Sequence, residues 1–375
     1  MLSLKLGAGF WPGERILMGP GPSNVHPRVL RAMSLPLLGH LDPDFLALLD
    51  RISENLRQVF RTRNELTFAV SGTGSSGMEA SLVNVLEPEN EVIIGVNGVF
   101  GQRLMEVALR LGARVHALEA PMGEAFDPER LIQAHKKVPK AKALVVVHAE
   151  TSTGVRQPLE EVGEYLKDKE TLFVVDAVTS LGGVPLEVDG WSIDICYSGT
   201  QKCLSVPPGL SPITFSTKAL EAIDRRKTPV SSWYLDTTLI RRYLGSERFY
   251  HHTAPISMLY GLYEGTQIVL EEGLEARWQR HEKLGQKLQE GLEELGFRLL
   301  VENSLRLPQL TSAFVPEGTS EGWFREELLG RYGIEVGGGL GELKGRILRV
   351  GLMGETARPG NVTLLLDGLR TLIAE

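Results

Sequence analysis

Short runs rich in Val, Ile and Leu alternate with stretches of helical periodicity over the first two-thirds of the chain. The runs lack the polar alternation of a half-exposed strand, so both strand faces are expected to be buried under helices, as in a mostly parallel sheet. This order predicts a doubly wound α/β unit, in which ligands bind beyond the carboxyl ends of the strands. The expected strands cover residues 66–72, 91–98, 141–150, 171–178, 193–199 and 211–216.

The pattern changes after about Ser257. Residues 256–296 have the periodicity of one long helix, or of two helices joined near Gly273. A smaller α+β unit follows, with expected strands at 311–317 and 346–354 and expected helices at 320–333 and 360–375. We therefore predict three parts: a Gly- and Pro-rich N-terminal arm over residues 1–20, a large domain over 21–272 and a small C-terminal domain over 273–375.

The composition narrows the class of partner. The 375 residues have a formal net charge of −7, and the acidic residues are spread along the chain, which argues against nucleic acid or an anionic membrane as the main partner. No apolar run approaches the ~20 residues needed to span a bilayer, and neither end resembles a targeting signal. Two cysteines are too few for a disulfide framework, so we expect a protein of the reducing cytoplasm.

A glycine-rich segment, GTGSSG at 72–77, follows the first expected strand and fits the G-x-G-x-x-G pattern of dinucleotide-binding sites. That pattern also needs an acidic residue at the end of the next strand, where this chain has Asn97. The Thr and Ser residues instead suit a phosphate monoester at the N-terminus of the following helix, where free N–H groups and the helix dipole attract an anion. A tight turn without a ligand is the alternative.

The histidines and cysteines do not indicate a metal site. Residues 148–150, HAE, resemble the H-x-E of zinc deaminases, but the P-C-x-x-C that such enzymes need is missing. Cys196 and Cys203 are seven residues apart, which fits no common zinc spacing. We therefore expect no bound metal.

Lys202 is the only acid or base between Asp194 and Lys218. A lysine amine attacks a carbonyl carbon only when it is unprotonated, and apolar surroundings favour that form by lowering its pKa. Lys202 is therefore a candidate for Schiff-base formation. An ordinary solvated lysine is the alternative.

Asp176 ends the apolar run LFVVD, at the expected carboxyl end of a strand. A buried carboxylate there needs a cationic partner or several donors. A pyridinium nitrogen is such a partner, and a carboxylate opposite it makes pyridoxal phosphate (PLP) a better electron sink. Together with the phosphate-type loop upstream and Lys202 26 residues later, Asp176 indicates a PLP site. An aspartate that only caps a turn is the alternative.

A series of ordered sequence blocks resembles the class V aminotransferases, which are PLP-dependent enzymes of fold type I. Within this family the chain is most similar to the alanine–glyoxylate and serine–pyruvate (serine–glyoxylate) aminotransferases, and the resemblance covers nearly the whole chain. The blocks are MGPGPSNVHP (18–27), SGTGSSGMEA (71–80), HAETSTGV (148–155), VVDAVTSLGGVP (174–185), YSGTQKCLSVPPG (197–209), SSWYLD (231–236), YHHTAP (250–255), GGGLGEL (337–343) and LRVGLMG (348–354).

The resemblance implies a role for each residue around the cofactor ring. Lys202 would bind PLP covalently and later move the proton between substrate and cofactor. Asp176 would pair with the pyridine nitrogen, while Val178 and Phe100 would cover the two ring faces. Thr151 would donate to the phenolic oxygen. Animal members have Trp at the position of Phe100, so the aromatic ring is kept but its size differs.

The resemblance also implies a phosphate site and a homodimer. The phosphate would bind Thr73, Gly74 and Ser75 at the helix N-terminus, with help from Gln201. Animal members have His at the position of Ser75, so that contact could be made by the backbone alone. In the family a Tyr and a Thr from the partner subunit complete the site, and these match Tyr250 and Thr253 here. The N-terminal arm would then lie across the partner.

Arg349 lies in an expected strand and shares a face with Gly351, which would leave room for a ligand. A planar guanidinium binds a carboxylate through two parallel hydrogen bonds. The resemblance implies that Arg349 binds the substrate α-carboxylate and that backbone near Gly21 closes the other side. Arg346 is expected to face solvent, and a surface arginine is also the alternative for Arg349.

We therefore expect ping-pong transfer of an amino group from a small amino acid, alanine or serine, to a 2-oxo acid such as glyoxylate or pyruvate. A cysteine desulfurase would need a nucleophilic cysteine after the lysine loop, and none follows Cys203. Aspartate or phosphoserine as donor is the remaining alternative. It would need further cations, and the placement of Arg225, Arg226, Arg241 and Arg242 is open from sequence.

Overall fold

The computed structural model describes residues 13–375. Its larger unit is built on a seven-stranded sheet in the order β2-β10-β9-β8-β5-β3-β4. Strand β10 runs antiparallel to both neighbours, while the other pairs are parallel. The mostly parallel sheet is thus confirmed. The strands are β2 (Leu66–Ser71), β3 (Glu91–Val96), β4 (Arg114–Glu119), β5 (Ala143–Val147), β8 (Leu172–Asp176), β9 (Ile195–Tyr197) and β10 (Leu210–Phe215).

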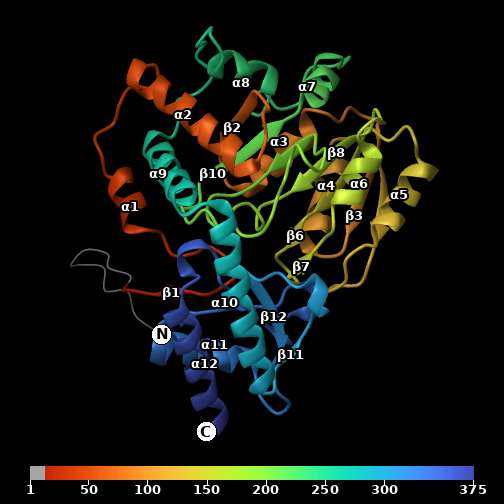
Figure 1. Ribbon diagram of the computed structural model, residues 1–375. Helices are drawn as coiled ribbons and strands as arrows, with labels where there is room; N and C mark the ends of the chain where they lie inside the picture. Colours follow the sequence, from red (N-terminus) through yellow and green to blue (C-terminus); the bar gives the residue numbers. More distant parts are fainter. Residues whose placement is uncertain (1–12) are drawn as a thin grey trace.

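Both faces of this sheet are covered by helices (Figure 1). Along β8 the side chains alternate between two hydrophobic cores, with Phe173 and Val175 in one and Leu172 and Val174 in the other. One core includes α2, α6 and α9, and the other includes α3, α4, α7 and α8. The helices of this unit are α1 (Pro27–Met33), α2 (Pro43–Phe60), α3 (Gly74–Val83), α4 (Val99–Arg110), α5 (Pro128–Lys137), α6 (Glu160–Leu166), α7 (Thr217–Asp224), α8 (Thr237–Leu244) and α9 (Ile256–Glu272).

Strand β4 is the one strand of this sheet that the hydrophobic pattern did not predict. It forms the edge of the sheet, and all its residues are exposed or half-exposed. A strand whose faces are open to solvent needs no continuous apolar run, unlike the strands buried on both faces.

A second, four-stranded antiparallel sheet forms the C-terminal unit, in the order β11-β12-β15-β14. Its strands are β11 (Arg298–Leu299), β12 (Leu310–Phe314), β14 (Gly337–Gly338) and β15 (Ile347–Gly351), and its helices are α11 (Glu321–Tyr332) and α12 (Pro359–Ala374). Short pairs also form between β6 (Ala149–Glu150) and β7 (Val155–Arg156), and between β1 (Ile16–Leu17) and β13 (Ile334–Glu335).

Residues 256–294 form two helices that meet at Gly273. Helix α9 ends at Glu272 and α10 (Leu274–Glu294) begins at once, because Gly273 adopts φ 81° and breaks the helical path. In Figure 1 α10 runs from the large unit down along the C-terminal unit. Its first residue, Leu274, packs in the core of the large unit, and Leu284, Leu288 and Leu292 pack in the C-terminal core. The domain boundary at 272 and 273 stays a prediction.

The expected N-terminal arm falls partly outside the described residues, since residues 1–12 are not described. In the described part, β1 pairs with β13 of the same chain, and Met18 is fully buried in the C-terminal core. This part therefore packs on the C-terminal unit. Within residues 13–375 no helix is long and apolar enough to cross a membrane.

Candidate active site

The carboxyl ends of the parallel strands lie at one edge of the large sheet, and most of the predicted residues follow these ends. Thr73 follows β2, Phe100 follows β3, Thr151 follows β5 and Val178 follows β8. The loop of residues 198–209, which contains Lys202, connects β9 to the start of β10 at the same edge, where Leu210 pairs with Ser71. Sequence reasoning thus placed these residues at the correct end of the strands.

Asp176 is buried at the end of β8, with 2% of its surface exposed. Its Oδ1 accepts a hydrogen bond of 2.8 Å from the Val178 N–H, and its Oδ2 accepts one of 2.7 Å from the Tyr197 hydroxyl. Burial raises the pKa of Asp176 to about 6, although both hydrogen bonds oppose the shift. A buried carboxylate of this kind is poised to accept a cation.

Tyr197 is the residue that sequence reasoning missed. It ends β9 directly beside Asp176, because the parallel register pairs these two positions. The only sequence signal was a phenol at the end of an apolar strand, and a buried Tyr hydroxyl needs a polar partner. The partner could not be identified without the register of the two strands.

Lys202 is also buried, with 7% of its surface exposed. Burial and, next to it, the nearby charge of Arg349 lower the pKa of its amine to about 8, while Asp176 acts in the opposite direction. Its Nζ donates to the carbonyl of Pro20. A Cβ on Gly21, where φ is 104°, would lie 2.6 Å from this Nζ, so the Gly21 backbone lies directly against Lys202. Its predicted contact with the substrate carboxylate stays a prediction.

The N-terminus of α3 has the features of an anion site. Thr73 is the N-cap residue, yet no side chain caps the free N–H groups of the first turn. Gly74 lies against Val178, because a Cβ there would meet Val178 Cγ2 at 3.1 Å. Ser75 is exposed in the same turn. The amide Oε1 of Gln201 is buried without a hydrogen-bond partner among the described residues, 2.8 Å from the Cβ position of Gly199.

Phe100 and Thr151 are connected through Glu150. The fully buried Glu150 carboxylate accepts a hydrogen bond of 3.3 Å from the Phe100 N–H at the start of α4, and bonds of 3.0 and 2.6 Å from the backbone and hydroxyl of Ser152. The Thr151 hydroxyl lies 2.5 Å from that of Thr179. Glu150, considered from sequence only as a zinc-site residue, therefore holds together the two segments predicted to contact the cofactor ring.

Arg349 reaches the large unit from β15 and is 6% exposed. Its Nη1 donates to the Thr151 carbonyl at 2.9 Å and its Nε donates to the Gly338 carbonyl at 2.7 Å. Burial lowers the pKa of Arg349 to about 10, while Glu150 and Glu321 oppose the shift. The guanidinium stays charged at neutral pH, and Thr151 places it at the strand ends that also hold Asp176.

Gly351 does not have the role expected from the sequence. A Cβ there would lie 2.0 Å from the carbonyl oxygen of Gly19, and its N–H donates to Met18 at 2.7 Å. The missing side chain therefore makes room for the N-terminal backbone and not for a ligand. As a result, residues 18–21 run from β15 to Lys202.

Tyr250 and Thr253 are not brought to this cluster within one chain. Tyr250 is 49% exposed, and its hydroxyl lies 3.2 Å from that of Thr253, which is also exposed. Trp233, Tyr234 and Phe249 are exposed aromatic side chains in neighbouring segments. The role of Tyr250 and Thr253 in a partner's phosphate site stays a prediction.

The described residues fit PLP by their chemistry. The uncapped turn of α3 suits the phosphate, the buried Asp176 suits the protonated ring nitrogen, and the Lys202 amine suits the aldehyde. The unpartnered atom of Gln201 is its acceptor Oε1, so the Nε2 of that amide is the group that would donate to the phosphate.

Comparison with known proteins gives a consistent result. The family model Aminotransferase class-V matches residues 17–346. The chain is 41% identical to the (S)-ureidoglycine–glyoxylate transaminase of Bacillus subtilis (strain 168), over 96% of this chain and 90% of that protein. It is 43% identical to the alanine–glyoxylate aminotransferase of Callithrix jacchus, over 95% and 87%. The crystal structure of alanine–glyoxylate aminotransferase from Nostoc sp. superposes with a TM-score of 0.94 at 49% identity, over 98% of both chains.

Proposed function

The chain belongs to the class-V aminotransferases, PLP-dependent enzymes of fold type I, and we propose that it transfers the amino group of a small amino acid, alanine or serine, to glyoxylate or pyruvate. The observation that supports this most is the set of three buried charged groups around the strand ends: the Lys202 amine, the Asp176 carboxylate and the Arg349 guanidinium. The names of the relatives support glyoxylate as acceptor.

In this proposal PLP, when bound, supplies the electron sink that stabilises the substrate carbanion and stores the amino group between two half-reactions. Asp176 would keep the ring nitrogen protonated by its negative charge. Phe100 and Val178 would contact the ring, Thr151 would donate to its phenolic oxygen, and Thr73, Gly74, Ser75 and Gln201 would bind the phosphate.

Lys202 acts as the base in the proposed mechanism. Its pKa of about 8 leaves a useful fraction of the amine unprotonated at neutral pH, as proton removal from the substrate α-carbon requires. Arg349 binds the substrate carboxylate, and the backbone at Gly21 lies on the opposite side of Lys202. The donor leaves as its 2-oxo acid before the acceptor binds, which gives ping-pong kinetics.

The charges around the site favour a small, uncharged substrate side chain. Arg349 is the cation whose charge lowers the pKa of Lys202, and Arg103 lies over the ring of Phe100. The four arginines whose placement was open have partners elsewhere, two of them directly after α7 and two on α8: Arg225 with Glu221, Arg226 with the carbonyls of Asn84 and Leu86, Arg241 with Asp224, and Arg242 with Glu247. Aspartate or phosphoserine would need a second cation, so these donors are disfavoured.

We also propose a homodimer in which Tyr250 and Thr253 complete the partner's phosphate site, since both hydroxyls are exposed and lie outside the cluster of their own chain. The two free, buried cysteines, Cys196 and Cys203, suit the reducing cytoplasm.

The test follows the visible absorption band of the PLP-loaded protein while alanine, serine, aspartate or (S)-ureidoglycine is added alone. The last donor is included because the Bacillus subtilis relative acts on it. We expect alanine or serine to bleach the band and glyoxylate to restore it. Bleaching by aspartate alone would overturn the donor assignment, and bleaching by ureidoglycine alone would replace it. No band with added PLP would overturn the role of Lys202.

A further inference from the structure

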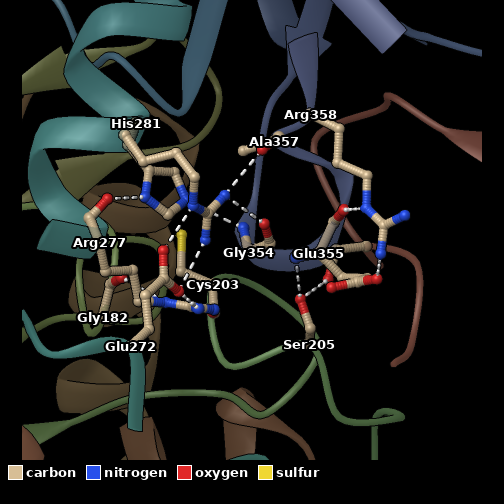
Figure 2. A network of polar contacts seen from close by, with 12 residues as sticks. Gly182, Cys203, Ser205, Glu272, Arg277, His281, Gly354, Glu355, Ala357 and Arg358 are labelled. Carbon is tan, nitrogen blue, oxygen red and sulfur yellow. Dashed lines mark hydrogen bonds and ion pairs between the residues drawn. The ribbon is translucent and has the colours of Figure 1, made fainter. Parts of the chain in front are cut away.

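A buried polar network joins the segment that contains Lys202 to the segment that follows Arg349 (Figure 2). Its centre is Arg277 on α10, which is 3% exposed. Arg277 Nη2 donates to the carbonyl of Cys203, the residue after Lys202, at 2.5 Å. Its Nε donates to the carbonyl of Gly182 at 3.1 Å, and its Nη1 pairs with Glu272.

His281 continues the network one turn further along α10 and is fully buried. Its Nδ1 lies 2.8 Å from the carbonyl oxygen of Arg277, and its Nε2 accepts a hydrogen bond of 2.9 Å from the N–H of Gly354. Burial lowers the pKa of His281 to about 3, with Arg277 and Arg280 acting in the same direction. The ring is therefore neutral, and its Nδ1 holds the proton and donates to Arg277.

The two segments also touch directly. A Cβ on Gly354 would lie 2.1 Å from Ser205 Oγ and 2.6 Å from the Cys203 carbonyl oxygen. The Glu355 N–H donates to Ser205 Oγ at 2.8 Å. The turn that follows β15 is thus packed backbone against backbone on the Lys202 loop, and only glycine fits at position 354, where φ is also 53°.

The arginines of this network bind carbonyl groups in both segments. Arg277 binds the Cys203 carbonyl in the Lys202 loop, and Arg280 binds two carbonyls in the turn that follows β15. Arg280 Nη1 donates to the carbonyls of Gly354 at 2.9 Å and Ala357 at 2.7 Å, while Glu272 forms ion pairs with both Arg280 and Arg277. A buried ionic network often stabilises a protein no more than well-packed apolar side chains of equal volume, because its groups lose their hydration. Its contribution here is the fixed direction of each hydrogen bond, which defines one relative position of the two segments.

We propose that Arg277 and His281 are positioning residues that set the location of Lys202 relative to Arg349, acting through Cys203 on one side and Gly354 on the other. This inference rests on the roles proposed above for Lys202 and Arg349. Lys202 lies in a loop of the large unit and Arg349 lies on β15 of the C-terminal unit. A change in the distance between them would therefore move the substrate α-carbon away from the amine that must reach it. Misplacement of about 1 Å costs on the order of a hundredfold in rate.

The experiment compares Arg277→Met, Arg277→Lys and His281→Leu with the wild-type PLP-loaded enzyme. For each of the variants Arg277→Met and His281→Leu we expect a higher KM for glyoxylate and a lower kcat. The ratio kcat/KM should fall by about ten- to a hundredfold in each variant. We also expect the pH titration of the visible cofactor band to shift, because the surroundings of Lys202 change. Arg277→Lys keeps the charge and should recover part of both effects.

Arg226→Met is the matched control, because Arg226 also donates to loop carbonyls, those of Asn84 and Leu86, but these lie in another part of the large unit. It should leave kcat/KM and the titration unchanged even where it lowers Tm. Folded Arg277→Met and His281→Leu variants with wild-type kcat/KM and titration would overturn the inference, while the function proposed above would stand. If Arg277→Met does not fold, His281→Leu and Arg277→Lys decide by the same two measurements. A wild-type enzyme without the visible band would refute the proposed function instead.

Discussion

The hydroxyl of Tyr197 donates a hydrogen bond of 2.7 Å to Asp176 from the adjacent strand, and both side chains are buried in the sheet. The ionised Asp176 carboxylate is unfavourable in the cofactor-free protein, because burial raises its pKa to about 6 from 3.8 even though the Tyr197 hydrogen bond and the charge of Lys202 oppose the shift. This shift corresponds to a cost of about 3 kcal/mol for the ionised form at pH 7. A bound cation offsets this cost. We therefore expect Asp176 to lower the stability of the cofactor-free protein and to raise its affinity for a ligand with a positively charged group.

Asp176→Asn should therefore stabilise the cofactor-free protein at pH 7 by up to about 3 kcal/mol, and lower kcat with PLP by about a hundredfold or more. In the wild type, Asp176 binds a proton more tightly in the folded protein than in the unfolded chain, because its pKa is about 6 and not 3.8. The free energy of unfolding should therefore gain a contribution from Asp176 as the pH falls from 6 towards 3.8. The variant should lack this contribution. Denaturant unfolding of both cofactor-free proteins between pH 4 and 8 measures it, and equal pH dependence would contradict the assignment.

The pKa of Lys202 predicts how fast the cofactor-free protein captures PLP. The unprotonated amine attacks the aldehyde, so the rate should rise tenfold per pH unit up to about pH 8 and then level off. An ordinary lysine would level off only above pH 10. Stopped-flow mixing with PLP measures the profile. Arg349→Met removes a nearby positive charge and should move the plateau to higher pH.

Arg349→Lys should raise KM for glyoxylate by about ten- to a hundredfold, because one ammonium replaces two parallel hydrogen bonds from a guanidinium. Arg346→Lys is the control, since Arg346 lies three residues earlier but is exposed, over the ring of Phe314. Steady-state kinetics with varied glyoxylate distinguish the two. Equal KM values in both variants would remove Arg349 from carboxylate binding.

The shared-site proposal predicts complementation between two inactive variants. One variant carries Lys202→Ala and the other carries Tyr250→Phe with Thr253→Ala, assayed at low PLP. Co-expressed chains should recover roughly a quarter of wild-type activity, because half of the dimers are mixed and each mixed dimer has one intact site. Each variant alone, and mixtures made after purification without subunit exchange, should stay inactive. A lack of recovery in confirmed mixed dimers would place Tyr250 and Thr253 outside the partner's site.

The sequence was sufficient for the doubly wound fold and for the placement of residues at the strand ends. The reason is that buried parallel strands need continuous apolar runs, and Asp176 and Thr73 directly follow such runs. Lys202 could be placed as well, because its loop returns to the same edge of the sheet. These features depend on local patterns and on one general rule of α/β sheets.

Features that depend on pairing between distant segments could not be predicted. The contact of Tyr197 with Asp176 depends on the register of β8 and β9, and β1 pairs with a strand more than 300 residues later. From the sequence, the space left by the missing side chain of Gly351 could hold either a ligand or another part of the backbone. The structure shows that the backbone of Gly19 fills it.

The strand order β2-β10-β9 and the pairing of β1 with β13 also determine when the active site can form during synthesis on the ribosome. Strand β2, which leads into Thr73, pairs only with β10, so it stays unpaired until residue 215 has left the ribosome. Residues 18–21, which lie against Lys202, wait for β13 and β15 at the end of the chain. The nascent chain therefore cannot use cofactor binding to stabilise its early intermediates. Until β10 has been synthesised, β2 lacks its partner in this sheet, and an unpaired strand edge favours aggregation.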